Sequence, residues 1–430
     1  MTENLESILI KMKASSMNLA NAETSLKNKA LENIKNNLQK HSKKIFKENE
    51  LDLARGVKNK LEAPLLERLK FNEKKLNTVL DGIEALIKFD DPINKVLSKT
   101  LLDDELVLTK VSVPIGIIGI IFESRPDALV QISTLCLKSG NCAILKGGSE
   151  ASSTNKILFK IIYESIVETD KIFQDTLQLI ETREQTKDIL KYDKYINLII
   201  PRGSNEFVKF IQDNSDIPVL GHAEGICHLY VDGSADIDKA VKIAVDSKTQ
   251  YVAVCNAVET LLVHKNIAEN FLPALKSEMD KKKVKLKGDE KTRKILPDIE
   301  KATEQDWSTE YLDYILSIKI VKNIDDAIEH INTFGSNHTD SIVTTNLANA
   351  EKFSKLVDSS SVMINCSTRF ADGYVYGMGA EVGISTNKIH SRGPVGLEGL
   401  TIYKYILQGN GQIISDYATG IKKYKHKKII

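Results

Sequence analysis

The sequence lacks the features of a disulfide-stabilised, membrane-spanning or nucleic-acid-binding protein. Its five cysteines are an odd number without a C-x-x-C pair, which argues against a disulfide framework or zinc ribbon and for the reduced thiols of a cytoplasm. No run of about 18 apolar residues occurs, and residues 1–21 carry scattered charges instead of a signal-peptide core. The net charge of +1 gives no general reason to expect nucleic acid. We therefore expect a cytoplasmic protein without membrane or nucleic-acid partners, long enough for two domains.

The two common phosphate-binding motifs, G-x-G-x-x-G and G-x-x-x-x-G-K-[ST], are also missing, and no metal site is predicted. Two turns each follow a predicted strand and precede a predicted helix. They are Lys146-Gly147-Gly148-Ser149 and Pro201-Arg202-Gly203-Ser204. Ligands of open α/β sheets bind beyond the carboxyl ends of strands, near helix N-termini. These turns are candidates for a nucleotide site, with tight βα turns as the equally weighted alternative.

Strands and helices alternate along most of the chain. Residues 1 to about 97 are helical in pattern and rich in charge, and the apolar, β-branched run 115–122 predicts a buried parallel strand. Alternation continues to about residue 214, and a second round runs from strand 227–231 to strand 361–365. This pattern predicts a doubly wound α/β fold. Two strands, at about 106–113 and 400–413, lie outside the rhythm and are candidates for an oligomerisation arm.

Cys255 lies in a predicted connection between a helix and a strand, where a thiol can face a cleft and backbone N–H groups can converge. A thiolate there would be a strong nucleophile with an oxyanion-stabilising backbone. The local pattern by itself favours a packed cysteine. None of the histidines His222, His228, His264 and His338 stands at a sequence spacing from Cys255 that is diagnostic of a catalytic Cys/His pair.

Three arginines, Arg125, Arg369 and Arg392, stand among small polar residues in predicted loops. The guanidinium fork matches phosphate and carboxylate groups. Each alone is typical of a solubilising surface residue, whereas together they indicate an anionic substrate.

Seven segments carry a resemblance to a known family. They are, in chain order, Val113–Asp127, Lys146–Ala151, Gly221–Gly225, Cys255–Leu262, Gly335–Asp340, Ser367–Phe370 and His390–Pro394. This ordered set resembles the γ-glutamyl phosphate reductase family of the aldehyde dehydrogenase superfamily, over nearly the whole chain to about residue 420. The resemblance implies an aldehyde dehydrogenase-like α/β fold, with a Rossmann-type cofactor domain, an α/β catalytic domain and a small β oligomerisation arm.

On this basis we expect residues 1–226 to form the cofactor-binding domain, with a helical part at 1–97. Residues 227–384 would form the catalytic domain with Cys255. Residues 385–430 would return to the cofactor domain, add the second arm strand and end in a basic tail, which is expected to be solvated. An arm of this kind implies a homo-oligomer.

The resemblance implies NADPH-dependent reduction of L-glutamyl 5-phosphate to L-glutamate 5-semialdehyde and phosphate, the second step of proline biosynthesis from glutamate. Cys255 would attack the acyl phosphate and carry the acyl group as a thioester. The other catalytic residues would be Ser124 and Asn256, with a donor near Ser124 and the N–H of Cys255 facing the oxyanion. The substrate's anionic groups would be held by Arg125, Arg369, His390 and Arg392.

The resemblance also implies the cofactor contacts. Lys146 would meet the adenosine ribose, Gly203 and Ser204 would approach the pyrophosphate, and Glu310 would hold the nicotinamide ribose. Ser149 stands where NAD-preferring relatives often have a glutamate. Without that carboxylate a 2′-phosphate is not repelled, which favours NADP.

One departure narrows the reaction. Alignment places His222 where hydrolytic aldehyde dehydrogenases carry a glutamate base, and Glu224 lies two residues further on. A reductase gains by this, because activated water would destroy the thioester. Two alternatives stay open: a coenzyme-A-acylating aldehyde dehydrogenase, and a non-catalytic scaffold that binds glutamate kinase.

Overall fold

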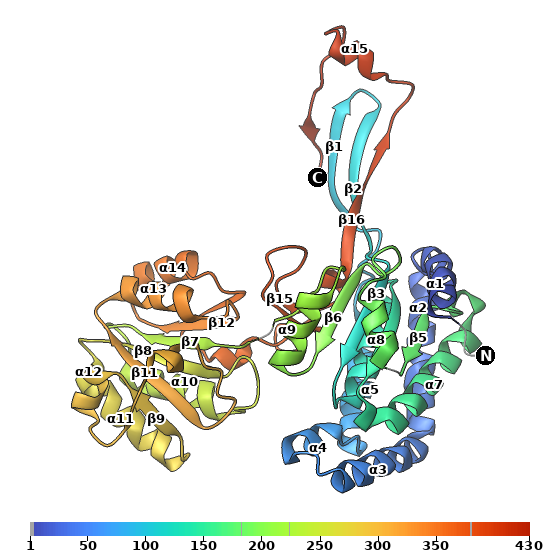
Figure 1. Ribbon diagram of the computed structural model, residues 1–430. Helices are drawn as coiled ribbons and strands as arrows, with labels where there is room; N and C mark the ends of the chain where they lie inside the picture. The colour runs from blue at the N-terminus through green and yellow to red at the C-terminus, as the bar shows by residue number, and fades with distance from the viewer. Residues whose placement is uncertain (1–3, 182, 223, 379–380) are drawn as a thin grey trace. The chain divides into compact units, whose positions relative to one another are not determined.

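The chain forms two compact units, each built on its own sheet. The computed structural model describes residues 4–181, 183–222, 224–378 and 381–430 (Figure 1). Unit 1 comprises residues 1–220, 378–383 and 395–430, and unit 2 comprises residues 221–377 and 384–394. None of the helices in the described residues is both long and apolar enough to cross a membrane.

Unit 1 has a four-stranded parallel sheet in the order β5-β4-β3-β6. Every residue of the central strand β3 is buried, as its apolar sequence predicts. The strands are β3 (Ile117–Phe122), β4 (Cys142–Gly147), β5 (Leu177–Ile180) and β6 (Leu198–Arg202).

Helices cover this sheet and extend its core. In α5, Leu76, Val79, Leu80 and Ile83 are buried at helical spacing, which gives the helix one apolar face. The helices of unit 1 are α1 (Leu5–Leu19), α2 (Thr24–Lys40), α3 (Ser42–Lys58), α4 (Ala63–Leu69), α5 (Glu73–Lys88), α6 (Pro126–Lys138), α7 (Ser152–Thr169), α8 (Arg183–Ile189) and α9 (Asn205–Asn214).

A long antiparallel arm also belongs to unit 1 (Figure 1). Its strands lie in the order β16-β2-β1-β17, so that β2 (Leu106–Pro114) pairs with β1 (Val96–Asp103) on one side and β16 (Thr401–Gln408) on the other. The end of the chain adds α15 (Ile414–Ala418) and the short strand β17 (Lys427–Lys428). Both strands predicted outside the α/β rhythm are therefore arm strands.

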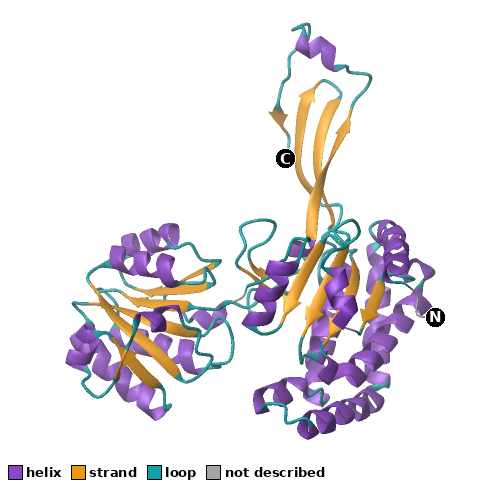
Figure 2. Ribbon diagram, in the orientation of Figure 1, coloured by secondary structure: helices purple, strands orange, loops and turns teal. Residues whose placement is uncertain are grey.

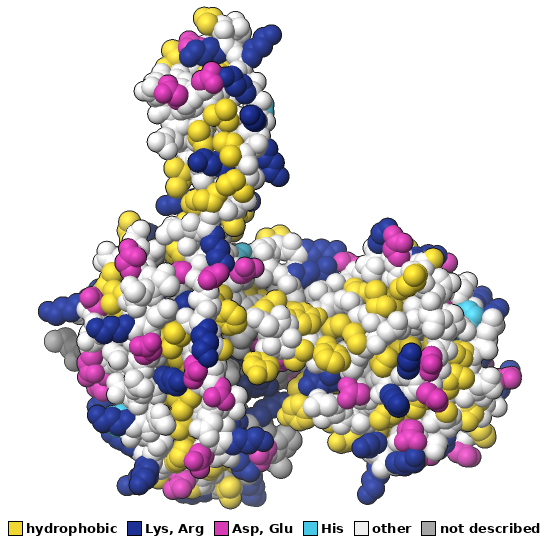
Figure 3. Space-filling model, turned by 180° about the vertical axis from the view of Figure 1, so that it is seen from behind, with side chains coloured by type: hydrophobic (Ala, Val, Ile, Leu, Met, Phe, Trp, Pro, Cys, Tyr) yellow, Lys and Arg dark blue, Asp and Glu magenta, His cyan; other side chains and the backbone are white. Residues whose placement is uncertain are grey.

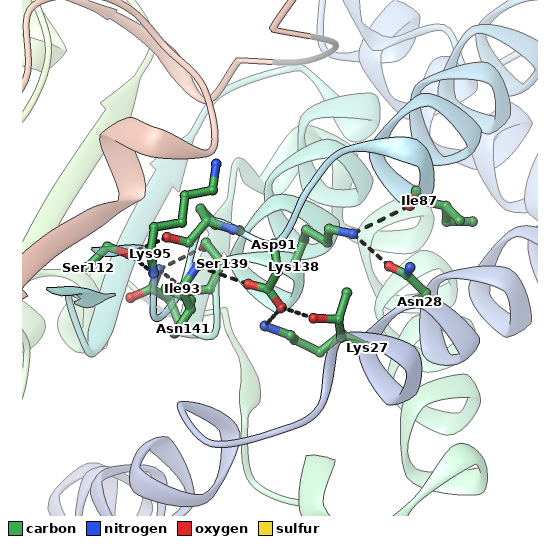
Figure 4. A network of polar contacts seen from close by, with 12 residues as sticks. Lys27, Asn28, Ile87, Asp91, Ile93, Lys95, Ser112, Lys138, Ser139 and Asn141 are labelled. Carbon is green, nitrogen blue, oxygen red and sulfur yellow. Dashed lines mark hydrogen bonds and ion pairs between the residues drawn. The ribbon is translucent and has the colours of Figure 1, made fainter. Parts of the chain in front are cut away.

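A polar network fixes the chain where the arm begins (Figure 4). The buried Lys27 pairs with Asp91, whose carboxylate also accepts the N–H of Ile93 at 3.0 Å. The hydroxyl of Ser112, in β2, donates to the carbonyl of Pro92 at 2.6 Å and accepts the N–H of Lys95 at 2.9 Å. The two sides of the arm's base are thus tied together.

Unit 2 has a seven-stranded sheet in which all pairings are parallel, in the order β10-β9-β11-β8-β7-β12-β13. Helices cover both of its faces (Figure 2), with a separate apolar cluster on each. The strands are β7 (Cys227–Val231), β8 (Val258–His264), β9 (Lys285–Gly288), β10 (Glu300–Lys301), β11 (Ile315–Val321), β12 (Thr339–Val343) and β13 (Ser361–Ile364). The helices are α10 (Ile237–Thr249), α11 (Ala268–Lys281), α12 (Glu290–Ile295), α13 (Ile324–Phe334) and α14 (Leu347–Leu356).

The predicted α/β class is confirmed, and several boundaries differ. Strand β1 begins at Val96, within the part predicted to be helical to about residue 97, and continues to Asp103. Strand β11 was not predicted. The second arm strand ends at Gln408 rather than 413, because the glycine-rich turn 409–411 follows it. The compact units divide after residue 220, and residues 384–394 pack with unit 2. The assignment of cofactor and catalytic roles to residue ranges stays a prediction.

Candidate active site

Cys255 lies in the loop between α10 and β8, and its side chain is half-buried. The segment that carries Gly225 packs tightly against it. A Cβ atom added to Gly225 would lie 2.1 Å from the carbonyl oxygen of Cys255 and 2.4 Å from its Cα. Only glycine permits this approach, so the motif around Gly225 fixes the position of the thiol's backbone.

Buried groups hold the Cys255 loop from beneath. The thiol of Cys227 donates to the carbonyl oxygen of Cys255 at 3.1 Å, and burial raises the pKa of Cys227 well above its ordinary value. The side-chain amide of Asn256 donates to the backbone carbonyl of Ala371 at 2.9 Å. The backbone carbonyl of Asn256 accepts a hydrogen bond from the hydroxyl of Thr368 at 2.7 Å. In this structure Asn256 therefore joins the loop to the turn at 368–371, and its predicted catalytic role stays untested.

Two histidines flank the thiol. Donor atoms of His222, Cys255 and His338 lie within 4.8 Å of one another, and the two imidazole rings meet edge-on with centroids 4.7 Å apart. Nδ1 of His222 lies 2.8 Å from the carbonyl oxygen of Ile384, and Nδ1 of His338 lies 2.8 Å from the hydroxyl of Thr339. His338 is fully buried, and its Nε2 has no hydrogen-bond partner among the described residues.

This cluster lies at the amino edge of the unit 2 sheet. His222 precedes β7, Cys255 precedes β8 and His338 directly precedes β12, and these strands are neighbours in the order β8-β7-β12. Sequence reasoning did not connect His338 with Cys255. The only sequence signal was that His338 lies in the segment Gly335–Asp340, which belongs to the family resemblance but does not indicate that His338 lies near Cys255.

Arg369 lies in the turn that Asn256 holds. Its Nε donates to the side-chain oxygen of Gln250 at 2.9 Å. Burial lowers the pKa of Arg369. Among the groups that raise this pKa, the Cys255 thiol has the largest effect. The bonds of Asn256 thus bring the turn of Arg369 beside the Cys255 loop, and the predicted anion contact of Arg369 stays untested.

The loop of His390 and Arg392 has a different environment. Two guanidinium nitrogens of Arg392 donate to Asp358, one to its carboxylate at 3.0 Å and one to its carbonyl at 2.9 Å. Lys388 pairs with the same carboxylate and is the main cause that lowers the pKa of Asp358. His390 adopts a left-handed backbone with φ of 74°. Part of the fork of Arg392 is therefore already used, and its predicted anion contact stays untested.

The predicted residues of unit 1 gather at the carboxyl edge of its sheet. Ser124 follows β3, Lys146 and Ser149 lie at the end of β4, and Gly203 and Ser204 follow β6. Since β4, β3 and β6 are neighbours in this parallel sheet, their carboxyl ends share one edge. Arg125 begins α6 at the same edge.

Two carboxylates already occupy donors at this edge. Both the N–H and the hydroxyl of Ser124 donate to Glu150, at 2.6 and 2.8 Å, and Ser124 has a left-handed φ of 43°. Glu123 accepts the N–H of Ser204 at 3.1 Å, at the start of α9. Both of these donors of Ser124 are thus engaged by Glu150, and the predicted catalytic role of Ser124 stays untested. Sequence reasoning identified neither carboxylate.

Glu310 belongs to unit 2, in the loop before β11. Beneath that loop Lys248 and Glu259, both fully buried, form an ion pair at 2.5 Å. Glu259 also accepts the N–H of Leu312 at 3.2 Å, and Leu312 has a left-handed φ of 51°. Burial raises the pKa of Glu259, although Lys248 opposes this. The buried pair therefore fixes the backbone two residues from Glu310.

Comparison with known proteins identifies the class. The aldehyde dehydrogenase family model matches residues 13–308, and the chain belongs to that family. Within it, the chain is similar to proteins named γ-glutamyl phosphate reductase. The protein from Acetivibrio thermocellus is 60% identical over 426 residues, covering 99% of this chain and 98% of that protein. The protein from Methanosarcina mazei is 53% identical, covering 100% of this chain and 98% of that protein.

A solved structure agrees. The crystal structure of γ-glutamyl phosphate reductase from Thermotoga maritima is 42% identical, with a TM-score of 0.93 over 96% of this chain and 100% of that chain. The family resemblance and the aldehyde dehydrogenase-like fold predicted from the sequence are both confirmed.

Proposed function

We propose that this protein reduces L-glutamyl 5-phosphate to L-glutamate 5-semialdehyde with release of phosphate, in the biosynthesis of proline. The proposal rests on relatives of that name at 50–60% identity over nearly their full length. The structural observation that carries it is the half-buried Cys255, held by Gly225 and Cys227 on a loop that Asn256 joins to the turn of Arg369.

The chemistry assigned to Cys255 is covalent. Its thiolate attacks the acyl carbon of the substrate, the carbon–oxygen bond to phosphate breaks, and phosphate leaves with that electron pair. The product is a thioester on Sγ and inorganic phosphate. Phosphate is a good leaving group, so this step needs no strong general acid. Arg369 holds an anionic group of the substrate close to the thiol.

Protection of the thioester from water is the role assigned to His222. In the cluster of His222, Cys255 and His338 no carboxylate participates. Glu224, the nearest acidic residue in sequence to His222, is exposed. Since the cluster, within the described residues, contains no carboxylate that could act as a base on water, the acyl group survives for reduction.

A nicotinamide cofactor fits the carboxyl edge of the unit 1 sheet. The carboxylate of Glu123 on the N–H of Ser204 is a stand-in anion, which indicates that the start of α9 accepts negative charge. Lys146, Gly203 and Ser204 would hold the adenosine ribose and pyrophosphate, whereas the contact of Glu310 with the nicotinamide ribose is implied by the family resemblance alone. The bound cofactor supplies the hydride. Ser149 is exposed and uncharged, and on this ground we propose NADPH over NADH.

The arm supports an oligomer of identical chains. Hydrophobic side chains gather along it (Figure 3), and those exposed on β16 are Ile402, Tyr403, Tyr405, Ile406 and Leu407. An exposed apolar edge of this kind calls for a partner. We also propose a cytoplasmic location, because all five cysteines are free thiols. A glutamate kinase would supply the acyl phosphate.

The test compares two thiols of similar exposure. Cys255→Ser should lower turnover of glutamyl phosphate and NADPH to background, whereas Cys366→Ser should keep at least half of it, since Cys366 is also half-buried but lies outside the cluster. Near-normal turnover by Cys255→Ser would refute the covalent route. In the reverse direction, NADP reduction by the semialdehyde should depend on phosphate or arsenate. Dependence on coenzyme A would favour the acylating alternative instead.

A further inference from the structure

Two imidazoles and a thiol meet at the amino edge of the unit 2 sheet. We propose that His222, Cys255 and His338 bind a zinc ion, and that this reversibly blocks Cys255. The binding stands on geometry alone, while the inhibition rests on the proposed function.

The distances suit a tetrahedral ion after a small closure. Zinc lies about 2.0–2.1 Å from imidazole nitrogen and about 2.3 Å from thiolate sulfur, which puts neighbouring ligand atoms roughly 3.3–3.6 Å apart. The donor atoms of the three residues already lie within 4.8 Å of one another. Contraction by about 1 Å is within the reach of side-chain torsions, because Cys255 and His222 are only half-buried.

His222 has the hydrogen-bond pattern of a ligand. Its Nδ1 lies 2.8 Å from the carbonyl oxygen of Ile384, and a carbonyl can only accept. Nδ1 therefore carries a proton, and Nε2 is the ring nitrogen that would bind the zinc ion. Histidines bound to metals are commonly oriented in this way, by donation from the other ring nitrogen to a backbone carbonyl.

His338 gives the independent observation. The residue is fully buried, and Nε2 has no hydrogen-bond partner among the described residues. A buried nitrogen without a partner carries a desolvation cost, which a metal bond would remove. Its Nδ1 is already engaged with the hydroxyl of Thr339 at 2.8 Å.

The ligand types select zinc over the common hard cations. Two imidazoles and a thiol are borderline-soft donors, whereas magnesium and calcium prefer oxygen. The buried Cys227 is not counted as a fourth ligand, because its thiol already donates its hydrogen to the carbonyl of Cys255. With three protein ligands, one position of the ion stays open to water or an anion.

Inhibition follows from the bond to sulfur. When zinc binds, the thiol loses its proton to solvent and Sγ forms a metal–sulfur bond, so its lone pair is no longer available to the acyl carbon. Removal of the ion by a chelator returns the same thiolate, and no oxidation is involved. The site is thus a reversible inhibitor site that shares the nucleophile.

The binding test uses cobalt(II) as a visible substitute for zinc on the metal-free full-length protein. We expect a thiolate-to-cobalt charge-transfer band and tetrahedral visible bands, both displaced by zinc. Cys255→Ser should abolish the charge-transfer band. His222→Ala and His338→Ala should each weaken zinc binding by at least about 100-fold, since even outer-shell changes cost about 10–100-fold. Cys366→Ser is the matched control and should bind normally.

Two further results decide the proposal. Because His338→Ala removes a fully buried ring, His338→Cys is made in parallel, and it should keep a tetrahedral cobalt spectrum with a stronger sulfur band. Bands that persist unchanged in both histidine variants would place the metal on the thiol alone and overturn the site. Zinc inhibition that a chelator fails to reverse would overturn the reversible block. A protein that binds cobalt as expected but does not turn over glutamyl phosphate would refute only the proposed function.

Discussion

His330 should make unit 2 sensitive to mild acid. Its side chain is buried, and its Nδ1 lies 3.1 Å from the ammonium nitrogen of Lys319. An ammonium group can only donate, so Nδ1 accepts and the ring is held neutral. Burial, followed by the nearby His228 and Lys319, lowers the pKa of His330 from 6.5 to about 2.

The size of this acid sensitivity follows from the linkage between protonation of His330 and folding. Below pH 6.5 the unfolded chain binds a proton at His330 that the folded chain does not, so the stability that the neutral ring supplies is present above pH 6.5 and is lost as the pH falls. Between pH 7 and pH 5 the loss is about 2 kcal/mol. The raised pKa of Glu259 acts in the opposite sense over this range, so the slope of the whole protein is smaller than that of His330 alone.

The assay therefore compares the protein with His330→Asn, which keeps an acceptor for Lys319 but does not titrate. Urea unfolding is followed by fluorescence of Trp307, the only tryptophan of the chain, whose ring lies 5.6 Å from that of His330. The free energy of unfolding of the variant, relative to the original protein, should improve by about 2 kcal/mol from pH 7 to pH 5. His426→Asn, in the exposed tail, should show no such change. A difference that stays constant with pH would refute the neutral buried ring.

Three further changes test the site and its surroundings. Gly225→Ala should lower kcat/KM by about 100-fold. Its Cβ would push the Cys255 backbone away, and a displacement of a catalytic group by about 1 Å can lower the rate by that factor. Gly82→Ala, where a Cβ meets nothing within 4 Å in a helix, should raise the free energy of unfolding by about 0.5–1 kcal/mol in a urea titration. Glu123→Gln should lower the Kd for NADPH about 5- to 10-fold in a fluorescence titration, because it removes a charge that competes at the N–H of Ser204.

Each of these has a result that would contradict it. Full activity of Gly225→Ala would show that the Cys255 loop can move without cost. A Gly82→Ala protein that is less stable would mean that the helix position is not open. Weaker cofactor binding by Glu123→Gln would mean that the carboxylate contacts the bound cofactor instead of competing with it, for example at a ribose hydroxyl.

The fold could be predicted largely from local pattern. The buried strand β3 and the helices around it follow from apolar, β-branched and helical periodicities, which are properties of short segments. Strand β1 escaped because its sequence, VLSKTLLD, mixes polar and apolar residues without a clean period. Its pairing with β2 comes from tertiary context, which overrides weak local preference.

The site was predictable only in part. Cys255 and Arg369 were chosen from residue types and family resemblance, and in the structure Asn256 joins the loop of the first to the turn of the second. The convergence of His338 on Cys255 depends on the strand order β8-β7-β12, which no local spacing encodes. Likewise the carboxylate of Glu150 competes for Ser124 only because neighbouring strands end side by side.

The interleaving of the two units along the chain has a consequence for synthesis on the ribosome. All segments of unit 2 have emerged by residue 394, whereas unit 1 still lacks residues 395–430. Those residues supply β16, so β2 has an open edge until translation is nearly complete. An unpaired apolar strand edge in a partly made chain is a site of misassembly. The nascent protein is therefore prone to misassembly late in synthesis, when chaperones would act on the arm rather than on unit 2.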